Sequence, residues 1–171
     1  MAVDLYLFSA LNSLAGKSRI LDFLGIFFAQ YLAYILVVAA AIIIFSEKDW
    51  RKRFYDAFLV ALSLIVSRLF ITELIRFFYH RPRPFLATPE ITTLISKTAE
   101  ASFPSGHATF FFALATAIYF VRRKWFVYFL AGAAVMGVAR VFVGVHYPFD
   151  IVAGGILGWV SAWMVKKFLP R

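Results

Sequence analysis

Hydrophobic residues in this chain fall into long, nearly uncharged runs that are separated by short polar segments. The runs cover residues 21–45, 54–79, 105–121, 125–144 and 149–165. Runs of roughly 18 or more apolar residues are typical of transmembrane helices. We therefore predict an all-α, integral membrane helical bundle with five transmembrane helices.

The first apolar stretch, residues 3–14, is too short to span a bilayer and contains Asp4 and Asn12. Such a stretch is better interpreted as a helix that lies at the membrane interface. The N-terminus lacks the basic start that is typical of a signal peptide. Because the chain has 171 residues and no internal repeat, we expect one membrane-embedded domain over residues 1–171.

Composition agrees with a membrane protein, since 63% of the residues are hydrophobic and only 16% are charged. A soluble domain has about 45–50% apolar and about 25% charged residues. The absence of cysteine excludes disulfides, thiolate metal sites and a cysteine nucleophile. The net charge of +9 comes from short basic clusters between the apolar runs, so we expect no nucleic-acid partner.

Five transmembrane helices would place successive loops alternately on two sides of the membrane. Ten Lys and Arg residues then lie on one side, in residues 46–53, 122–124 and 166–171, against five on the other. Basic loops face the cytoplasm, so the first side is predicted to be cytoplasmic. The long proline-containing loop, residues 80–103, and the break at His146 are then predicted to face outward.

Charged and nucleophilic residue types gather at the predicted outward ends of the transmembrane helices. The candidate site comprises Arg76, Arg83, Ser105, Gly106, His107, Arg140, His146 and Asp150. A single arginine near the end of a transmembrane helix often has no catalytic role and simply extends its charged group to the lipid headgroups. Ionisable groups that converge at membrane depth are costly and usually functional, so the combination indicates a site.

These residue types suit phosphoryl transfer. Guanidinium groups offer paired donors to phosphate oxygens, and a helix that begins at Ser105-Gly106 would attract an anion to its N-terminus. Of the two histidines, one could attack phosphorus while the other protonates the leaving oxygen. Asp150 follows His146 by one helical turn and could orient its ring. A zinc site made of the two histidines and Asp150 is the alternative, which the neighbouring arginines disfavour by charge repulsion.

Three segments of the site resemble the type 2 phosphatidic acid phosphatase superfamily, or lipid phosphate phosphatases. Its signature reads K-x6-R-P, P-S-G-H and S-R-x5-H-x3-D, and this chain has Arg76-x6-Arg83-Pro84, Pro104-Ser105-Gly106-His107 and Arg140-x5-His146-x3-Asp150. The spacing within every segment matches. Two residues depart from the pattern, since Arg76 replaces a lysine and Ala139 replaces a serine.

The resemblance implies that His146 forms a phosphohistidine, that Asp150 supports it and that His107 protonates the leaving group. It implies no metal and no other cofactor. It also implies a phosphate-binding role for the remaining site residues: Arg76, Arg83, Ser105, Gly106 and Arg140.

A narrower resemblance concerns the substrate. Arg83-Pro84-Phe85 and residues 101–107 are similar to small bacterial undecaprenyl-diphosphate phosphatases. This implies a lipid diphosphate substrate among membrane lipids, cleaved at the outer face of the bacterial inner membrane. Phosphatidylglycerophosphate and phosphatidate are the alternative substrates, and an anion transporter or channel is the alternative class. The transmembrane helices argue against a third class, the vanadate-dependent haloperoxidases, which are soluble and far larger. The sequence does not define an oligomeric state.

Several polar or small residues lie outside this pattern. Arg68 and Glu73 lie within the second apolar run. Glu73 precedes Arg76 by three residues, a spacing that allows an ion pair on one helix face, so we expect a structural pairing. His80 is expected at the membrane interface, while Arg81 is either a contact for a second phosphate or a solvated loop charge. The G-x-x-x-G spacing at residues 154–158 predicts close helix packing.

Overall fold

The computed structural model describes residues 2–87, 91–96 and 101–169, and every regular element that these residues form is helical. The elements follow in this order: α1 (Ala2–Asn12), α2 (Arg19–Ile26), the π-helix η1 (Phe27–Tyr31), α3 (Leu32–Phe45), α4 (Trp50–Leu64), the π-helix η2 (Ile65–Ile71), α5 (Thr72–Phe78), α6 (Pro84–Ala87), α7 (Gly106–Arg122), the 3-10 helix η3 (Arg123–Trp125), α8 (Phe126–Phe142) and α9 (Pro148–Phe168). The all-helical fold agrees with the prediction.

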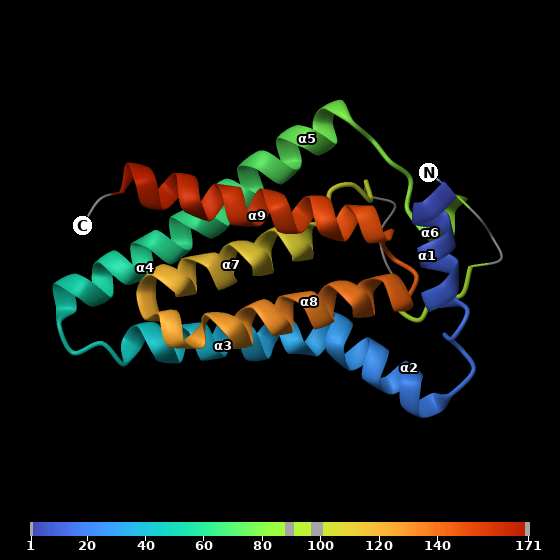
Figure 1. The fold of residues 1–171 in the computed structure, drawn as a ribbon, viewed down its shortest axis with the longest axis horizontal. Helices are drawn as coiled ribbons and strands as arrows, with labels where there is room; N and C mark the ends of the chain where they lie inside the picture. The colour runs from blue at the N-terminus through green and yellow to red at the C-terminus, as the bar shows by residue number, and fades with distance from the viewer. Residues whose placement is uncertain (1, 88–90, 97–100, 170–171) are drawn as a thin grey trace.

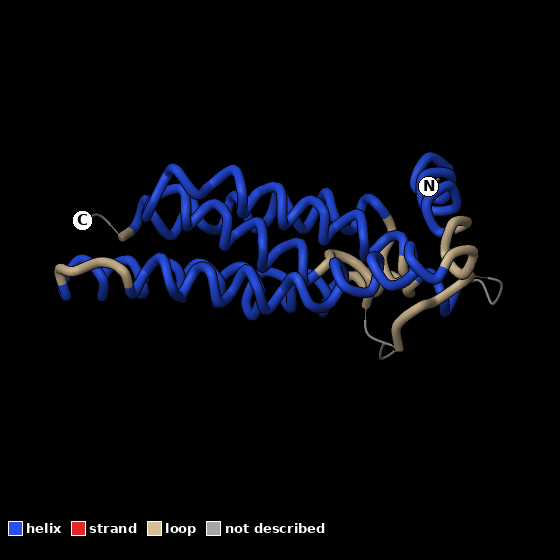
Figure 2. The backbone as a smooth tube through the Cα atoms, turned by 90° about the horizontal axis from the view of Figure 1, so that it is seen from below, coloured by secondary structure: helices blue, strands red, loops and turns tan. Residues whose placement is uncertain are grey.

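The long helices run alongside one another as an elongated bundle, and α1 lies across one end of it (Figure 1, Figure 2). In the described part of the chain, four helical segments are long and apolar enough to cross a membrane: Arg19–Phe45, Trp50–Phe78, Gly106–Phe142 and Pro148–Phe168. The third segment contains two of the five predicted runs, because it turns back at η3 and α8 then lies beside α7 (Figure 1).

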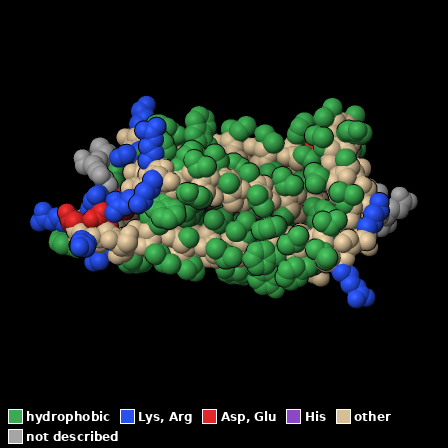
Figure 3. Space-filling model, turned by 60° about the horizontal axis from the view of Figure 1, so that its bottom comes forward, with side chains coloured by type: hydrophobic (Ala, Val, Ile, Leu, Met, Phe, Trp, Pro, Cys, Tyr) green, Lys and Arg blue, Asp and Glu red, His purple; other side chains and the backbone are tan. Residues whose placement is uncertain are grey.

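The outer surface of the bundle is apolar along its length. Figure 3 shows hydrophobic side chains over the long side of the molecule and Lys and Arg at its two ends. At one end, Glu47 forms ion pairs with Arg122 at 2.7 Å and with Lys52 at 2.9 Å. These two partners, Arg122 foremost, lower the pKa of Glu47 to about 2. The contacts join the α3–α4 connection to the end of α7.

Among the described residues, α7 and α9 make the most extensive contact between two helices, and glycines allow their backbones to approach closely. A Cβ atom at Gly158 would lie 2.3 Å from the backbone oxygen of Thr109, and one at Gly154 would lie 2.7 Å from that of Ser105. Neither backbone oxygen can move aside easily, so larger residues would separate the two helices. The predicted close packing is confirmed, and it holds the start of α7 against the first turns of α9.

Candidate active site

His146 and Asp150 lie at the junction between α8 and α9. The backbone turns at Gly144, whose φ is +83°, and a Cβ there would lie 2.5 Å from the backbone oxygen of Thr92. Tyr147 is the N-cap of α9, and its N–H donates to Asp150 Oδ2 at 2.9 Å. His146 Nδ1 lies 3.6 Å from the same oxygen. Asp150 is therefore oriented by the helix start and faces one ring nitrogen of His146, which leaves Nε2 on the other side of the ring.

Ser102 is a further part of this site that sequence reasoning missed. Its hydroxyl donates to Asp150 Oδ2 and lies 3.4 Å from His146 Nδ1. Ser102 is fully buried, although it belongs to the long loop between α6 and α7. Its place just before the P-S-G-H segment was the only available signal. Neither hydrophobic periodicity nor the three-segment signature includes it.

Burial determines the protonation state of His146. Removal from water, together with the charges of Arg140 and Arg83, lowers the pKa of His146 to about 3, although the neighbouring carboxylate of Asp150 acts in the opposite direction. His146 is therefore a neutral imidazole at physiological pH. Only this form has a nitrogen lone pair that can attack phosphorus.

The start of α7 is built as the sequence predicted. Ser105 has an extended backbone and its hydroxyl accepts the N–H of Ala108 at 3.5 Å, so it is the N-cap. Its own N–H donates to the backbone oxygen of Asp150 at 3.0 Å, which ties α7 to α9. A Cβ at Gly106 would lie 2.6 Å from Nε of Arg68. The small residue thus lets a guanidinium approach the positive end of the helix dipole.

Two of the predicted arginines reach the backbone next to these residues. Arg76 donates from Nη2 to the backbone oxygen of Pro104 at 3.2 Å. Arg83 donates from Nη1 to the backbone oxygen of Val145 at 3.4 Å and is 3% exposed. Arg76 therefore lies beside the N-cap of α7, and Arg83 lies beside His146.

Arg140 is the most buried cation of the site. It is 1% exposed and donates from Nη1 to the backbone oxygen of Ala29 at 3.2 Å, while its buried Nε has no hydrogen-bond partner among the described residues. The charges of Arg83 and Arg76 act on it. Buried donors normally have partners, and clustered like charges repel. A bound anion such as phosphate would accept a hydrogen bond from Nε and would reduce the repulsion among the arginines.

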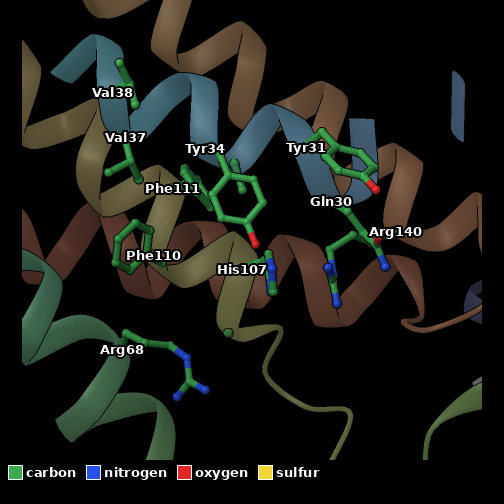
Figure 4. A pocket seen from close by; sticks show the side chains of 12 residues that line it. Gln30, Tyr31, Tyr34, Val37, Val38, Arg68, His107, Phe110, Phe111 and Arg140 are labelled. Atoms are coloured by element: carbon green, nitrogen blue, oxygen red, sulfur yellow. The ribbon is translucent and has the colours of Figure 1, made fainter. Parts of the chain in front are cut away.

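A cavity of about 720 Å³ opens between α3, η2 and the start of α7. Figure 4 shows His107, Arg68 and Arg140 on its walls. The apolar and aromatic part of the lining comes from η1, α3 and α7, and consists of Tyr31, Tyr34, Val37, Val38, Phe110 and Phe111. The cavity thus combines cationic groups with a wall that suits a lipid chain.

The other site residues lie around this cavity or behind it. Arg76 and Arg68 line a neighbouring cavity of about 580 Å³. Ser105, Arg83, His146 and Asp150 are buried, and the contacts given above connect them to one another. All eight predicted residues therefore belong to one cluster at the end of the bundle where α1 lies.

The structure shows the partners of two charged residues outside the signature, Arg68 and Arg81. Glu73 lies 3.4 Å from Arg76, so the predicted structural pairing is confirmed, and Glu73 also forms an ion pair with Arg68. Arg81 is not a solvated loop charge, because its side chain is 14% exposed and forms ion pairs with Asp4 and Asp150. Both terminal nitrogens face these carboxylates, so the geometry does not support a contact with a second phosphate either.

The described residues show no ligand set for the zinc alternative. In residues 2–87, 91–96 and 101–169, no three His, Asp or Glu side chains group as metal ligands. The expectation that no metal takes part stays a prediction.

Comparison with known proteins defines the class of this protein. Residues 56–171 match the family model of the PAP2 superfamily, so the chain belongs to that superfamily. It is 31% identical over 164 residues to undecaprenyl-diphosphatase BcrC of Bacillus subtilis, with 95% of this chain and 82% of the relative covered. It is 27% identical over 164 residues to bacitracin transport permease protein BcrC of Bacillus licheniformis, covering 96% and 79%.

The fold agrees with this membership. The crystal structure of Aquifex aeolicus LpxE matches with a TM-score of 0.76 over 98% of this chain and 96% of that one, at 24% identity. The predicted family resemblance is therefore confirmed. The protein is a multi-pass membrane phosphatase of the PAP2 superfamily, a phosphoric ester hydrolase.

Proposed function

We propose that this phosphatase hydrolyses a prenyl diphosphate, undecaprenyl diphosphate in bacteria, to the lipid monophosphate through a phosphohistidine and without a metal. The observation that carries the proposal is the pairing of a neutral, buried His146 with Asp150, next to clustered arginines. Among these, Arg140 has a buried Nε without a partner in the described structure. Membership of the superfamily favours a hydrolase over the anion transporter or channel.

The first step transfers the terminal phosphoryl group to the enzyme. His146 Nε2 attacks the terminal phosphorus, and the bond between that phosphorus and the bridging oxygen breaks. His107 donates a proton to the bridging oxygen, so the lipid monophosphate leaves. Because the imidazole becomes cationic, Asp150 stabilises it through Nδ1. His146 is 1% exposed, so side chains between it and the cavity must move before it contacts phosphate.

The second step releases phosphate. His107, now neutral, accepts a proton from a water molecule that attacks the phosphohistidine. The P–N bond breaks, and its electron pair returns to Nε2 of His146. Arg76, Arg83 and Arg140 would neutralise the phosphoryl oxygens in both steps, the role that metal ions have in other phosphatases.

The shape of the cavity supports a lipid substrate. Its lining includes Tyr34, Val37 and Val38 of α3, all exposed on the hydrophobic side of the bundle. A lipid could therefore keep its chain in the bilayer while the headgroup enters beside His107. A water-soluble phosphate ester has no lipid chain, so it would gain no binding energy from this apolar part of the lining.

The position of Arg68 supports the proposal that the substrate is a diphosphate rather than a phosphate monoester. Arg68 adds a fourth guanidinium to the cavity that contains His107 and Arg140. A charge-assisted hydrogen bond contributes about 1.5–3 kcal/mol, so Arg68→Gln should lower kcat/KM for farnesyl diphosphate about 10- to 100-fold. The value for phosphatidate should change less than about threefold. Phosphate release by the purified protein from a panel of lipid phosphates and diphosphates measures both.

Two variants control this experiment. Arg19→Gln changes an exposed arginine of α2 and should leave both substrates unaffected. Glu73→Gln removes the carboxylate that pairs with Arg68 and Arg76 but keeps both cations, so the preference for diphosphate should persist. If the unmodified protein turned over phosphatidate or phosphatidylglycerophosphate as well as farnesyl diphosphate, the prenyl-diphosphate proposal would be wrong. The phosphohistidine mechanism would be unaffected.

We also propose that the single domain crosses the inner membrane five times, with α1 at the interface and the site on the extracytoplasmic face. Figure 3 supports this arrangement, since more Lys and Arg residues lie at the end where Figure 1 places the α3–α4 connection, opposite to the site. Such basic loops prefer the cytoplasm.

Cysteine labelling tests this sidedness. The chain contains no cysteine, so a single introduced thiol has no background. Thr93 and Arg123 are exposed at opposite ends of the bundle. In spheroplasts, Thr93→Cys should react with a membrane-impermeant maleimide, whereas Arg123→Cys should react only after permeabilisation. The opposite pattern would place the site in the cytoplasm.

A further inference from the structure

We infer that Arg81 and Asp4 are positioning residues for Asp150, so that the N-terminal helix α1 contributes to catalysis. This inference rests on the proposed phosphohistidine mechanism. Neither residue belongs to the three-segment signature, and Asp4 lies 146 positions before Asp150 in the chain.

The contacts form a chain from α1 to the nucleophile. Arg81 Nη2 lies 2.6 Å from Asp4 Oδ2, and Arg81 Nη1 lies 2.7 Å from Asp150 Oδ1. The Arg81 guanidinium also lies 3.8 Å from the ring centroid of Tyr147. Asp4 is 1% exposed, and its Oδ1 accepts the N–H of Phe149 at 2.9 Å. Arg81 is thus held in one position by α1 and by the first turn of α9.

The two oxygens of Asp150 have different partners. Oδ2 accepts hydrogen bonds from Ser102 and from the N–H of Tyr147, and it faces His146 Nδ1. Oδ1 is bound by Arg81. A carboxylate held at both oxygens cannot rotate freely about its Cβ–Cγ bond. Arg81 therefore acts together with Ser102 and the Tyr147 N–H to keep Oδ2 directed at His146.

Asp4 balances the charge of this cluster. When Nε2 of His146 bonds to phosphorus, the ring acquires a positive charge that Asp150 must stabilise. Arg81 alone would cancel the charge of Asp150. Two carboxylates around one guanidinium leave a net charge of −1 beside the imidazole. Removal of the Asp4 charge should therefore weaken the stabilisation even where Arg81 is kept.

A role of Arg81 in substrate binding has less support. Its side chain is 14% exposed, both terminal nitrogens face carboxylates, and it is not part of the lining of either cavity that contains His107 or Arg76. A substrate ligand and a positioning residue differ in their effects. The first changes KM for the substrate it contacts, whereas the second changes kcat for every substrate.

Kinetics of four variants test the inference, with farnesyl diphosphate and phosphatidate as substrates. Arg81→Ala should lower kcat about 10- to 100-fold, the effect of a misplaced catalytic group, and by the same factor for both substrates. KM should stay within about twofold. Arg81→Lys should recover part of the loss, and Asp4→Asn should lower kcat in the same way. The double variant should be no slower than Arg81→Ala, because both residues act through one contact chain.

The control is Arg19→Ala, an exposed arginine of α2 near the same end, which should keep normal kinetics. A rise in KM confined to the diphosphate would make Arg81 a substrate ligand and overturn the inference. Unchanged kcat in folded Asp4→Asn and Arg81→Lys would also overturn it, even where Arg81→Ala fails to fold. If the unmodified protein hydrolysed no lipid phosphate at all, the proposed function would fail instead.

Discussion

Replacement of His146 by alanine is expected to reduce phosphate release about a thousandfold or more, as removal of a covalent nucleophile does in other enzymes. The side chain is buried between Asp150 and two arginines, and no other imidazole approaches this carboxylate in the described structure. We expect that His107 cannot replace it, because His107 lies on α7 at the wall of the cavity and packs against Phe111. Acid-labile phosphate should be trapped on the unmodified protein during turnover but not on His146→Ala.

The assay compares initial rates of purified protein in detergent with EDTA present throughout. The unmodified enzyme should keep its activity under these conditions, since arginines rather than a metal would neutralise the phosphate. Arg19→Gln provides a control, because this arginine of α2 is exposed, lines neither cavity and should not affect turnover. Residual activity above about a tenth of normal in His146→Ala would remove it from the nucleophile's role. Loss of activity in EDTA that zinc restores would favour the metal site.

Replacement of Arg140 by methionine should lower kcat/KM about 100- to 1000-fold, the range observed when a preorganised donor to transition-state charge is lost. Its effect on stability should be the opposite of that of an ordinary core substitution. Arg140 is a buried cation close to two like charges, and its Nε lacks a partner in the described structure. A side chain of similar length without charge removes this repulsion, so the Tm should stay the same or rise.

Thermal unfolding and kinetics together test this prediction. Vanadate imitates phosphate and should raise the Tm of the unmodified protein more than that of Arg140→Met, because a ligand stabilises in proportion to its affinity. The activity of Arg140→Lys should lie between that of the unmodified protein and that of Arg140→Met, since lysine keeps the charge but not the paired donors. A drop of more than about 5 °C in the Tm of Arg140→Met, with unchanged vanadate stabilisation, would show a structural role.

The amino-acid sequence alone predicted the helical class, which the structure shows, and the eight residues proposed for the candidate site. Both depend on local patterns. A run such as residues 21–45 is apolar because a bilayer requires it, and Ser105-Gly106 is a helix start whatever surrounds it. The His146-x3-Asp150 spacing likewise places a carboxylate near a ring nitrogen within one turn of chain. The number of crossings was less well determined, because α7 and α8 join through a 3-10 turn into one helical segment.

Only the tertiary structure decided how that site is supported. Ser102 and Arg81 lie in a loop without periodicity, and Asp4 lies in a helix that the sequence placed at the membrane interface. Ser102 and Arg81 contact Asp150 across 48 and 69 positions of the chain. Asp4, which lies 146 positions before Asp150, is connected to it through Arg81. No local pattern encodes such pairs, because they form only when α7 and α9 pack through their glycines and α1 closes the end of the bundle. The sequence thus predicts the groups proposed to contact the phosphate, and long-range packing shows which residues lie against them.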